Sequence, residues 1–135
     1  MKENKLDSVD QRQLFSAVGQ AKLINRYYEL FREHNIPVGQ VLTTKESFGT
    51  RRHYLNQKNC MTVMLANGVI PIVNENDTIS VSELMFTDND ELSGLIASMM
   101  NVQASVPSRR VNTLLPIFTA TRVNTCFIFA NLLTI

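Results

Sequence analysis

The sequence predicts an α/β fold in which helices cover both faces of a parallel sheet, giving three layers. Segments with helical hydrophobic spacing alternate with short strand-like segments, in the order helix, strand, helix, strand, helix. This alternation is typical of parallel strands joined by helical crossovers. Residues 69–73 form an apolar run that only Pro71 interrupts, which predicts a strand buried on both faces.

The first helix is expected between residues 8 and 35. Ser8 or Asp10 is the candidate N-cap, and the helix should end near His34 and Asn35. Its apolar residues recur at helical spacing: Leu14, Phe15, Val18, Ala21, Leu23, Ile24, Tyr27, Tyr28 and Leu30. After a break at residues 35–37, the alternation in residues 38–44 predicts a strand, and residues 45–50 are expected to form a loop.

A second helix should begin after Thr50 and stop at Asn67 and Gly68. Met61 belongs to its expected core face, and Cys60 is interpreted as a buried free thiol. Residues 78–86 alternate loosely and predict a small hairpin. The third helix is expected over residues 88–100, where Leu92, Leu95, Ile96 and Met99 share one helical face.

Composition indicates one ordinary globular domain. The chain has 135 residues, 44% hydrophobic and 19% charged, with a net charge of +1. This balance gives no sign of binding to nucleic acid or an anionic membrane. Cys60 and Cys126 lack metal-ligand or redox spacing. The N-terminus lacks the apolar core of a signal peptide, so a cytoplasmic protein is expected.

One polar cluster follows the predicted buried strand, and a second polar cluster begins the third predicted helix. The first comprises Asn74, Glu75, Asn76 and Asp77, directly after the buried strand. The second is Asp88-Asn89-Asp90, at the start of a helix. In open α/β sheets, ligands bind beyond the carboxyl ends of the strands. Amide donors and carboxylate acceptors suit a small zwitterion such as an amino acid. The alternative is that these residues only form turns and helix caps.

Several motifs in register resemble the glutamate 5-kinases of the amino acid kinase family. The resemblance runs from about Gln11 to Ala104. The motifs that carry it are Ser16-Ala-Val-Gly-Gln20, Val38-Gly-Gln-Val-Leu42, Thr44-Lys45, Tyr54-Leu-Asn56, Val69-Ile-Pro-Ile-Val-Asn-Glu-Asn-Asp77 and Asp88-Asn-Asp90. It implies the α/β/α sandwich of that family, in incomplete form.

The resemblance also implies an activity and roles for the polar clusters. The activity is ATP-dependent phosphorylation of the γ-carboxylate of L-glutamate to glutamyl 5-phosphate, the first step of proline biosynthesis. Asn74, Asp77 and Asn89 would hold glutamate, with Asp77 accepting from its ammonium group. Asp88 would support the same substrate-binding loop, and Asp90 would serve catalysis by orienting lysines around the transferred phosphoryl group.

The implied cofactors are ATP and the Mg²⁺ that accompanies it. The implied partners are L-glutamate, proline as a feedback inhibitor, and further copies of the chain in a homo-oligomer. Most of the ATP site is expected to be missing from this chain, because the family's opening strand, glycine-rich turn and lysine do not precede Gln11. The isolated chain is therefore expected to be an inactive fragment.

The expected organisation is a polar extension over residues 1–10, a partial kinase domain over 11–104 and a tail without family motifs over 105–135. Pro107, Arg109 and Arg110 interrupt the place of a buried strand, so the tail is not expected to complete the sheet as a strand of the family would. Phe127, Ile128 and Phe129 could still pack against the core face that the missing strands leave bare. A change of reading frame near Gln103 would explain the tail. The alternative function is a non-catalytic α/β fragment that acts only through oligomer or partner contacts.

Overall fold

The computed structural model describes residues 8–79, 89–101, 117–120 and 125–129. Helices and strands alternate through this part of the chain, as the hydrophobic spacing predicts. The elements are α1 (Ser8–Arg32), β1 (Val38–Thr43), α2 (Glu46–Gly49), α3 (Arg51–Ala66), β2 (Ile70–Glu75), α4 (Asn89–Met99), β3 (Ile117–Ala120) and β4 (Thr125–Phe129). Residues 8–10, which were expected in the polar extension, are the first turn of α1.

The strands form a sheet in the order β1-β2-β4-β3. β1 and β2 are parallel along their whole length, from Val38 opposite Ile70 to Thr43 opposite Glu75. β4 lies parallel to β2, and β3 pairs with β4 in the antiparallel direction. The parallel core of the sheet is therefore confirmed, with an antiparallel strand at one edge.

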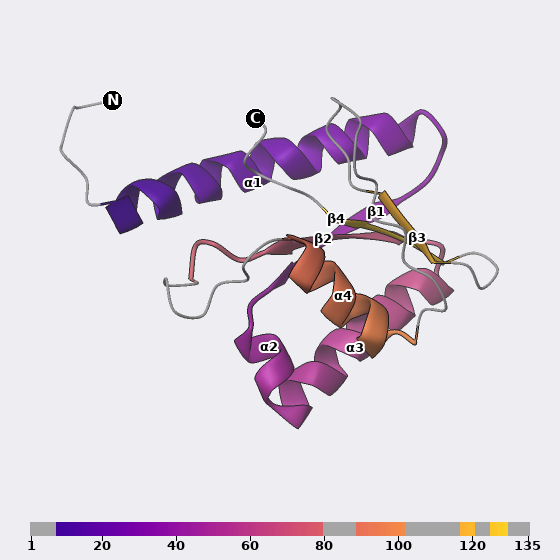
Figure 1. Ribbon diagram of the computed structural model, residues 1–135. Coiled ribbons are helices and arrows are strands. Elements are labelled where there is room, and N and C mark those ends of the chain that lie inside the picture. Colours follow the sequence, from indigo (N-terminus) through magenta and orange to yellow (C-terminus); the bar gives the residue numbers. More distant parts are fainter. Residues whose placement is uncertain (1–7, 80–88, 102–116, 121–124, 130–135) are drawn as a thin grey trace.

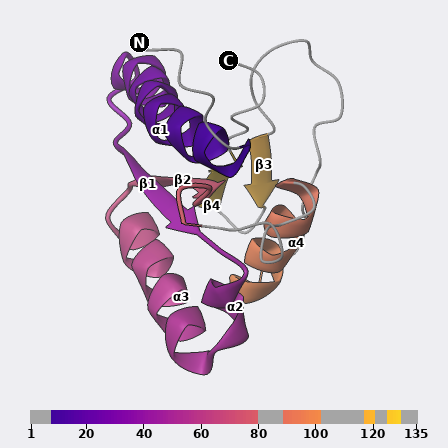
Figure 2. The ribbon, with the colours of Figure 1, turned by 90° about the vertical axis from the view of Figure 1, so that its left-hand side faces the viewer.

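Helices cover both faces of the sheet, so the three-layer arrangement is also confirmed. α1 lies along one face, and α3 and α4 lie on the other (Figures 1 and 2). Ile72 packs with Leu23 and Tyr27 of α1. Val73, the next residue of β2, belongs to the cluster on the opposite face. Successive strand residues point to opposite faces, which explains why residues 70–73 of β2 are all apolar.

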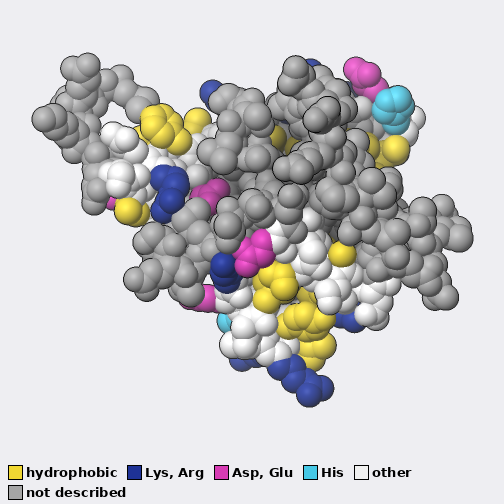
Figure 3. Space-filling view, in the orientation of Figure 1, with side chains coloured by type: hydrophobic (Ala, Val, Ile, Leu, Met, Phe, Trp, Pro, Cys, Tyr) yellow, Lys and Arg dark blue, Asp and Glu magenta, His cyan; other side chains and the backbone are white. Residues whose placement is uncertain are grey.

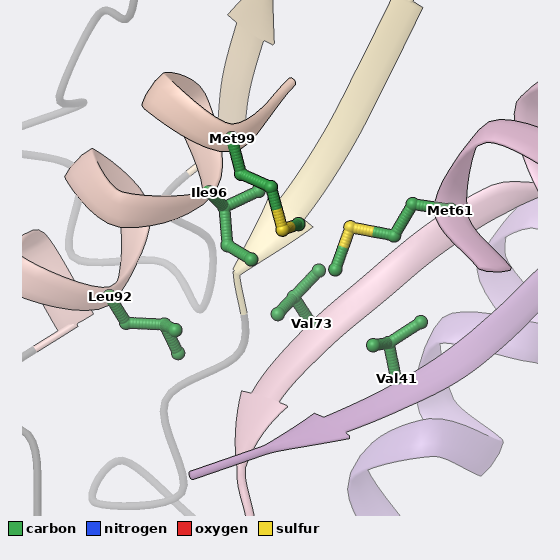
Figure 4. Packing of buried hydrophobic residues seen from close by; sticks show 6 residues of the cluster. All are labelled: Val41, Met61, Val73, Leu92, Ile96 and Met99. Carbon is green, nitrogen blue, oxygen red and sulfur yellow. The ribbon is translucent and has the colours of Figure 1, made fainter. Parts of the chain in front are cut away.

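The larger core cluster joins β1, β2, α3 and α4. Figure 4 shows Ile96 and Met99 of α4 and Met61 of α3 directed toward Val73 of β2. Met61 and Val73 are fully buried. The expectation that the methionines of the second helix are core residues is confirmed for Met61.

The ends of α3 follow from local chemistry. The Thr50 hydroxyl accepts a hydrogen bond from the backbone N–H of His53 at 3.3 Å, as expected of an N-cap. At the other end Gly68 has a φ of +71°, and the backbone N–H of Val69 donates to the carbonyl of Met64 at 2.9 Å. This is a left-handed helix stop, which glycine adopts without strain.

Two expectations about side chains and loops are wrong. Cys60 is exposed rather than buried, although the next residue of α3, Met61, is fully buried. Part of the loop expected over 45–50 is the short helix α2. The hairpin expected over residues 78–86 lies mostly outside the described residues; Thr78 and Ile79 belong to a turn.

The expectation for the tail is also wrong, because two of its segments are strands of the sheet. β4 pairs with β2 at Ile72 and Val73, and β3 extends the sheet beyond β4. Sequence reasoning gave weight to Pro107 and the neighbouring arginines, but the strands begin ten residues later, at Ile117. β2 otherwise presents unpaired backbone groups along this edge, which any extended segment can satisfy.

Candidate functional site

The carboxyl end of β2 holds a polar residue in a buried position. Asn74 is 5% exposed, and its Oδ1 accepts a hydrogen bond from the backbone N–H of Glu75 at 2.9 Å. Its Nδ2 is buried and has no hydrogen-bond partner in the described part of the chain. Leaving a buried donor unsatisfied costs about 1–3 kcal/mol. A ligand oxygen placed here would recover that cost, which makes Asn74 a candidate ligand-binding residue.

The loop that follows β2 is held in place from both sides. The backbone N–H of Asn76 donates to the Thr43 carbonyl at the end of β1, at 2.7 Å. From α1, Gln13 Nε2 donates to the Thr78 carbonyl at 2.9 Å and Gln20 Nε2 donates to the Glu75 carbonyl at 3.3 Å. The loop carrying Asp77 is thus fixed against both the sheet and α1.

Asp77 occupies an electrostatic environment set by burial and by one neighbouring charge. Burial raises the pKa of the Asp77 carboxyl above its ordinary value, and the Arg12 guanidinium of α1 acts in the opposite direction. A partly buried carboxylate can accept from an ammonium group, and an unpartnered amide nitrogen can donate to a carboxylate. Asp77 and Asn74, three residues apart at the end of β2 and in the loop after it, therefore offer the two polarities that an amino acid requires.

The second polar cluster is only partly within the described residues. Asn89 and Asp90 are the first two residues of α4, and Asp88 lies outside the described residues. Lys45 Nζ, just after β1, forms an ion pair with Glu91 Oε1 in the first turn of α4 at 3.3 Å. The start of α4 therefore lies close to the carboxyl end of β1, at the edge of the sheet where Asn74 also lies.

Sequence reasoning missed the residues of α1 that reach this site. Ser16 and Gln20 are buried on the face of α1 that also carries Leu23 and Tyr27. Polar residues at core-facing positions of an amphipathic helix could have indicated this contact, since buried polar groups in folded proteins have hydrogen-bond partners. Gln13 and Gln20 meet partners 65 and 55 residues away, which spacing along one helix does not reveal.

A separate cavity of about 550 Å³ lies along β1 and α3, lined among others by Thr44, Ser47 and Gln57. Asn74 and Asp77 are not among its described lining residues. Within the ranges that the structure describes, no three His, Cys, Asp or Glu side chains gather as a metal site. None of the described helices is long and apolar enough to cross a membrane.

The described residues do not fit a nucleotide. A glycine-rich turn leading from a strand into a helix would cradle phosphates. Gly39 instead lies within β1, where an added Cβ would meet the Met64 side chain, and Gly68 ends α3. Lys45, which follows β1, forms an ion pair with Glu91. We therefore assign no described residue to ATP or Mg²⁺.

Comparison with known proteins agrees with the sequence motifs. A profile of the amino acid kinase family matches residues 1–106. Glutamate 5-kinase of Bacteroides thetaiotaomicron is 89% identical over 104 residues, which are 77% of this chain and 29% of that protein. Glutamate 5-kinase of Chlorobaculum tepidum is 52% identical over 101 residues, 75% of this chain and 28% of that protein. The chain thus spans less than a third of the length of these relatives.

Proposed function

Because this chain belongs to the amino acid kinase family, we propose that it supplies the glutamate-binding part of a glutamate 5-kinase. The complete enzyme phosphorylates the γ-carboxylate of L-glutamate with ATP and so begins proline biosynthesis. We assign residues 11–104 to the kinase-derived part and residues 105–135 to a tail without family motifs. The observation that carries the proposal is the unpartnered, buried Asn74 amide at the carboxyl end of β2, within a motif shared with the family.

Each polar side chain of the site has a role in this proposal. Asp77 accepts from the ammonium group of glutamate, and the amides of Asn74 and Asn89 donate to its carboxylates. Asp88 supports the same loop. Asp90 is the catalytic residue, which orients positive charge around the transferred phosphoryl group. Phosphoryl transfer depends mainly on positioning and charge stabilisation, so these contacts account for most of what this part of the enzyme contributes.

The test is to place residues 11–104 in the complete Bacteroides thetaiotaomicron enzyme, whose matching segment is nearly identical. Asp77→Ala should raise KM for glutamate roughly tenfold to a hundredfold, because it removes a charge-assisted hydrogen bond of about 1.5–3 kcal/mol. Asp90→Ala should lower kcat instead, because it acts on the charge that develops during transfer.

Glu33→Ala is the matched control, since Glu33 is an exposed acidic residue just beyond α1. It should leave both kinetic constants unchanged. Unaltered KM in the Asp77 variant together with unaltered kcat in the Asp90 variant would show that both clusters only form turns and helix caps.

The same proposal covers regulation, assembly and location. The complete enzyme is cytoplasmic, is inhibited by proline and is a homo-oligomer, as the family resemblance implies. Support for assembly comes from α1, where Leu14, Val18 and Tyr28 are exposed on one side of the helix. Figure 3 shows hydrophobic side chains at several separate places on this face of the molecule. Exposed apolar residues on one side of a helix are typical of interaction sites. The 135-residue chain alone should not phosphorylate glutamate in a coupled assay.

A further inference from the structure

The backbone peptide that joins Glu75 to Asn76 is hydrogen-bonded at both of its polar groups. Its N–H, which belongs to Asn76, donates to the Thr43 carbonyl of β1 at 2.7 Å. Its carbonyl, which belongs to Glu75, accepts from Gln20 Nε2 of α1 at 3.3 Å. Because a peptide unit is planar and rigid, two bonds to different elements fix its orientation just before the turn that carries Asp77.

The peptide that joins Thr78 to Ile79 closes this turn and is bonded in the same way. Its N–H donates to the Asn76 carbonyl at 3.2 Å, which forms a turn with Asp77 and Thr78 at its centre. Its carbonyl accepts from Gln13 Nε2 of α1 at 2.9 Å. Two glutamines of one helix therefore hold the backbone on the two sides of Asp77.

The packing of α1 on the sheet explains why both glutamines reach this loop. Gln13 and Gln20 are seven positions apart, so they share one face of the helix and lie about 10 Å apart along its axis. Leu23 and Tyr27 continue this face and pack with Ile72 of β2. The hydrophobic contacts therefore set the position of both amide groups relative to the end of β2.

Both peptides lie next to the polar groups of the candidate site. Asn74 Oδ1 accepts from the N–H of Glu75 at 2.9 Å, and its buried Nδ2 has no partner in the described part of the chain. The direction of that amide group thus depends on the Glu75 backbone, whose carbonyl Gln20 holds. Asp77 lies inside the turn whose closing peptide Gln13 holds.

We propose that Gln13 and Gln20 are positioning residues of the amino-acid site, which hold Asn74 and Asp77 at the spacing that the substrate requires. Both glutamines act through the backbone, and neither has to touch the substrate. A loop that is already fixed loses less conformational entropy when a ligand binds, so the ligand binds more tightly. This role rests on the proposed function, because it assigns Asn74 and Asp77 to substrate binding.

The first experiment measures amide hydrogen exchange in the full 135-residue chain and needs no substrate. Gln13→Met keeps a side chain of similar length but removes the donor. It should lower the protection of the Ile79 amide about threefold to tenfold and leave Val73, in the middle of β2, unchanged. Gln20→Met should lower the protection of the Asn76 amide in the same selective way.

Asn25→Leu is the matched control for both variants. Asn25 is an exposed amide on the same helix, and its Nδ2 donates to Glu29 Oε1 within α1 at 3.2 Å. The control should leave the loop amides unchanged. Gln20 is 7% exposed, so Gln20→Met can affect folding. In that case Gln13→Met carries the test, because the bond of Gln13 is only partly buried.

The second experiment measures glutamate kinetics in the complete enzyme that carries residues 11–104. Gln13→Met should raise KM for glutamate about twofold to tenfold, the effect of one hydrogen bond, and leave kcat unchanged. In an Asp77→Ala background, Gln13→Met should raise KM no further, because the residue that it positions is gone. A merely structural role would lower the amount of active enzyme, and so the apparent kcat, in both backgrounds.

The possible failures are distinguishable. Unchanged protection of the Ile79 amide in Gln13→Met overturns the positioning role, as does a selective loss of protection that leaves KM unchanged. Neither result affects the proposed function while the unaltered complete enzyme phosphorylates glutamate. An unaltered complete enzyme without glutamate-dependent activity overturns the proposed function, and the positioning role for a substrate is then rejected with it, whatever the exchange rates.

Discussion

Tyr27 places a hydroxyl group between α1 and the sheet, where the residue is 2% exposed. This hydroxyl has no hydrogen-bond partner in the described part of the chain. Tyr27→Phe should therefore raise the free energy of unfolding by about 1 kcal/mol, because it removes an unsatisfied buried polar group and keeps the ring. Chemical denaturation measures the change. Tyr28→Phe is the control, since Tyr28 is 53% exposed and should show no effect.

The same residue makes stability depend on alkaline pH. Burial raises the pKa of Tyr27 from 10.0 to about 12. Below pH 10 the hydroxyl is protonated in both states, but between these two values the unfolded chain ionises first. The free energy of unfolding should fall over this range in the unchanged chain, and Tyr27→Phe should lack that part of the loss. Equal pH dependence of the two proteins would contradict burial of the hydroxyl.

At the scale of elements, replacing a glycine by alanine should have opposite effects on stability after α3 and within α4. Gly68 has a φ of +71° at the end of α3, so Gly68→Ala should lower the free energy of unfolding by about 1–2 kcal/mol. Gly94 lies exposed within α4, and an added Cβ would meet nothing within 4 Å. Gly94→Ala should stabilise by about 0.5–1 kcal/mol. Thermal unfolding of both variants tests the contrast, and destabilisation by both would contradict it.

The elements that could be predicted are those whose signals are local. Helical spacing and the Thr50 cap predicted α3, and the spacing of Leu92, Ile96 and Met99 predicted α4. The apolar run predicts a strand that ends at Val73, because Asn74 and Glu75 are polar, whereas β2 continues to Glu75. The ladder to β1 continues through them, with Thr43 opposite Glu75, so pairing between strands outweighs their low strand propensity.

At the scale of the whole molecule, β4 protects one edge of β2. The N–H groups of Ile70 and Asn76 donate toward β1, so the intervening even-numbered residues of β2 point the same way. Val73 consequently directs its N–H toward β4, where it lies opposite Phe129. Deleting residues 105–135 should reduce hydrogen-exchange protection at Val73 by about tenfold or more, whereas Ile72 should retain protection from β1.

Ile72 is the internal control for this deletion, because it belongs to the same strand but bonds to the other edge. Unchanged protection at both residues would mean that the tail contributes nothing to the sheet in solution. Loss at both residues would indicate global unfolding rather than an exposed edge, and circular dichroism of the shortened chain would identify that case.

Some residues of the candidate site could be predicted from local sequence patterns, whereas others are connected to it only by contacts between distant parts of the chain. Asn74 and Asp77 could be found from the sequence, because polar residues directly follow an apolar strand in an α/β pattern. Gln13 and Gln20 could not be connected to them, since their hydrogen-bond partners lie 65 and 55 residues along the chain. Asn89 and Asp90 begin α4 near the carboxyl edge because Leu92, Ile96 and Met99 pack this helix on the sheet.

The sequence by itself determined the three long helices, the two parallel strands, the family and the residues that carry its motifs. These follow from neighbours a few positions apart, where periodicity and turn chemistry act directly. Only the tertiary structure decided that α1 clamps the Asp77 loop and that β4 joins β2. Burial and backbone hydrogen bonding do not specify a partner in the sequence, because many segments can satisfy the same surface. Which segment does so depends on how the whole chain packs.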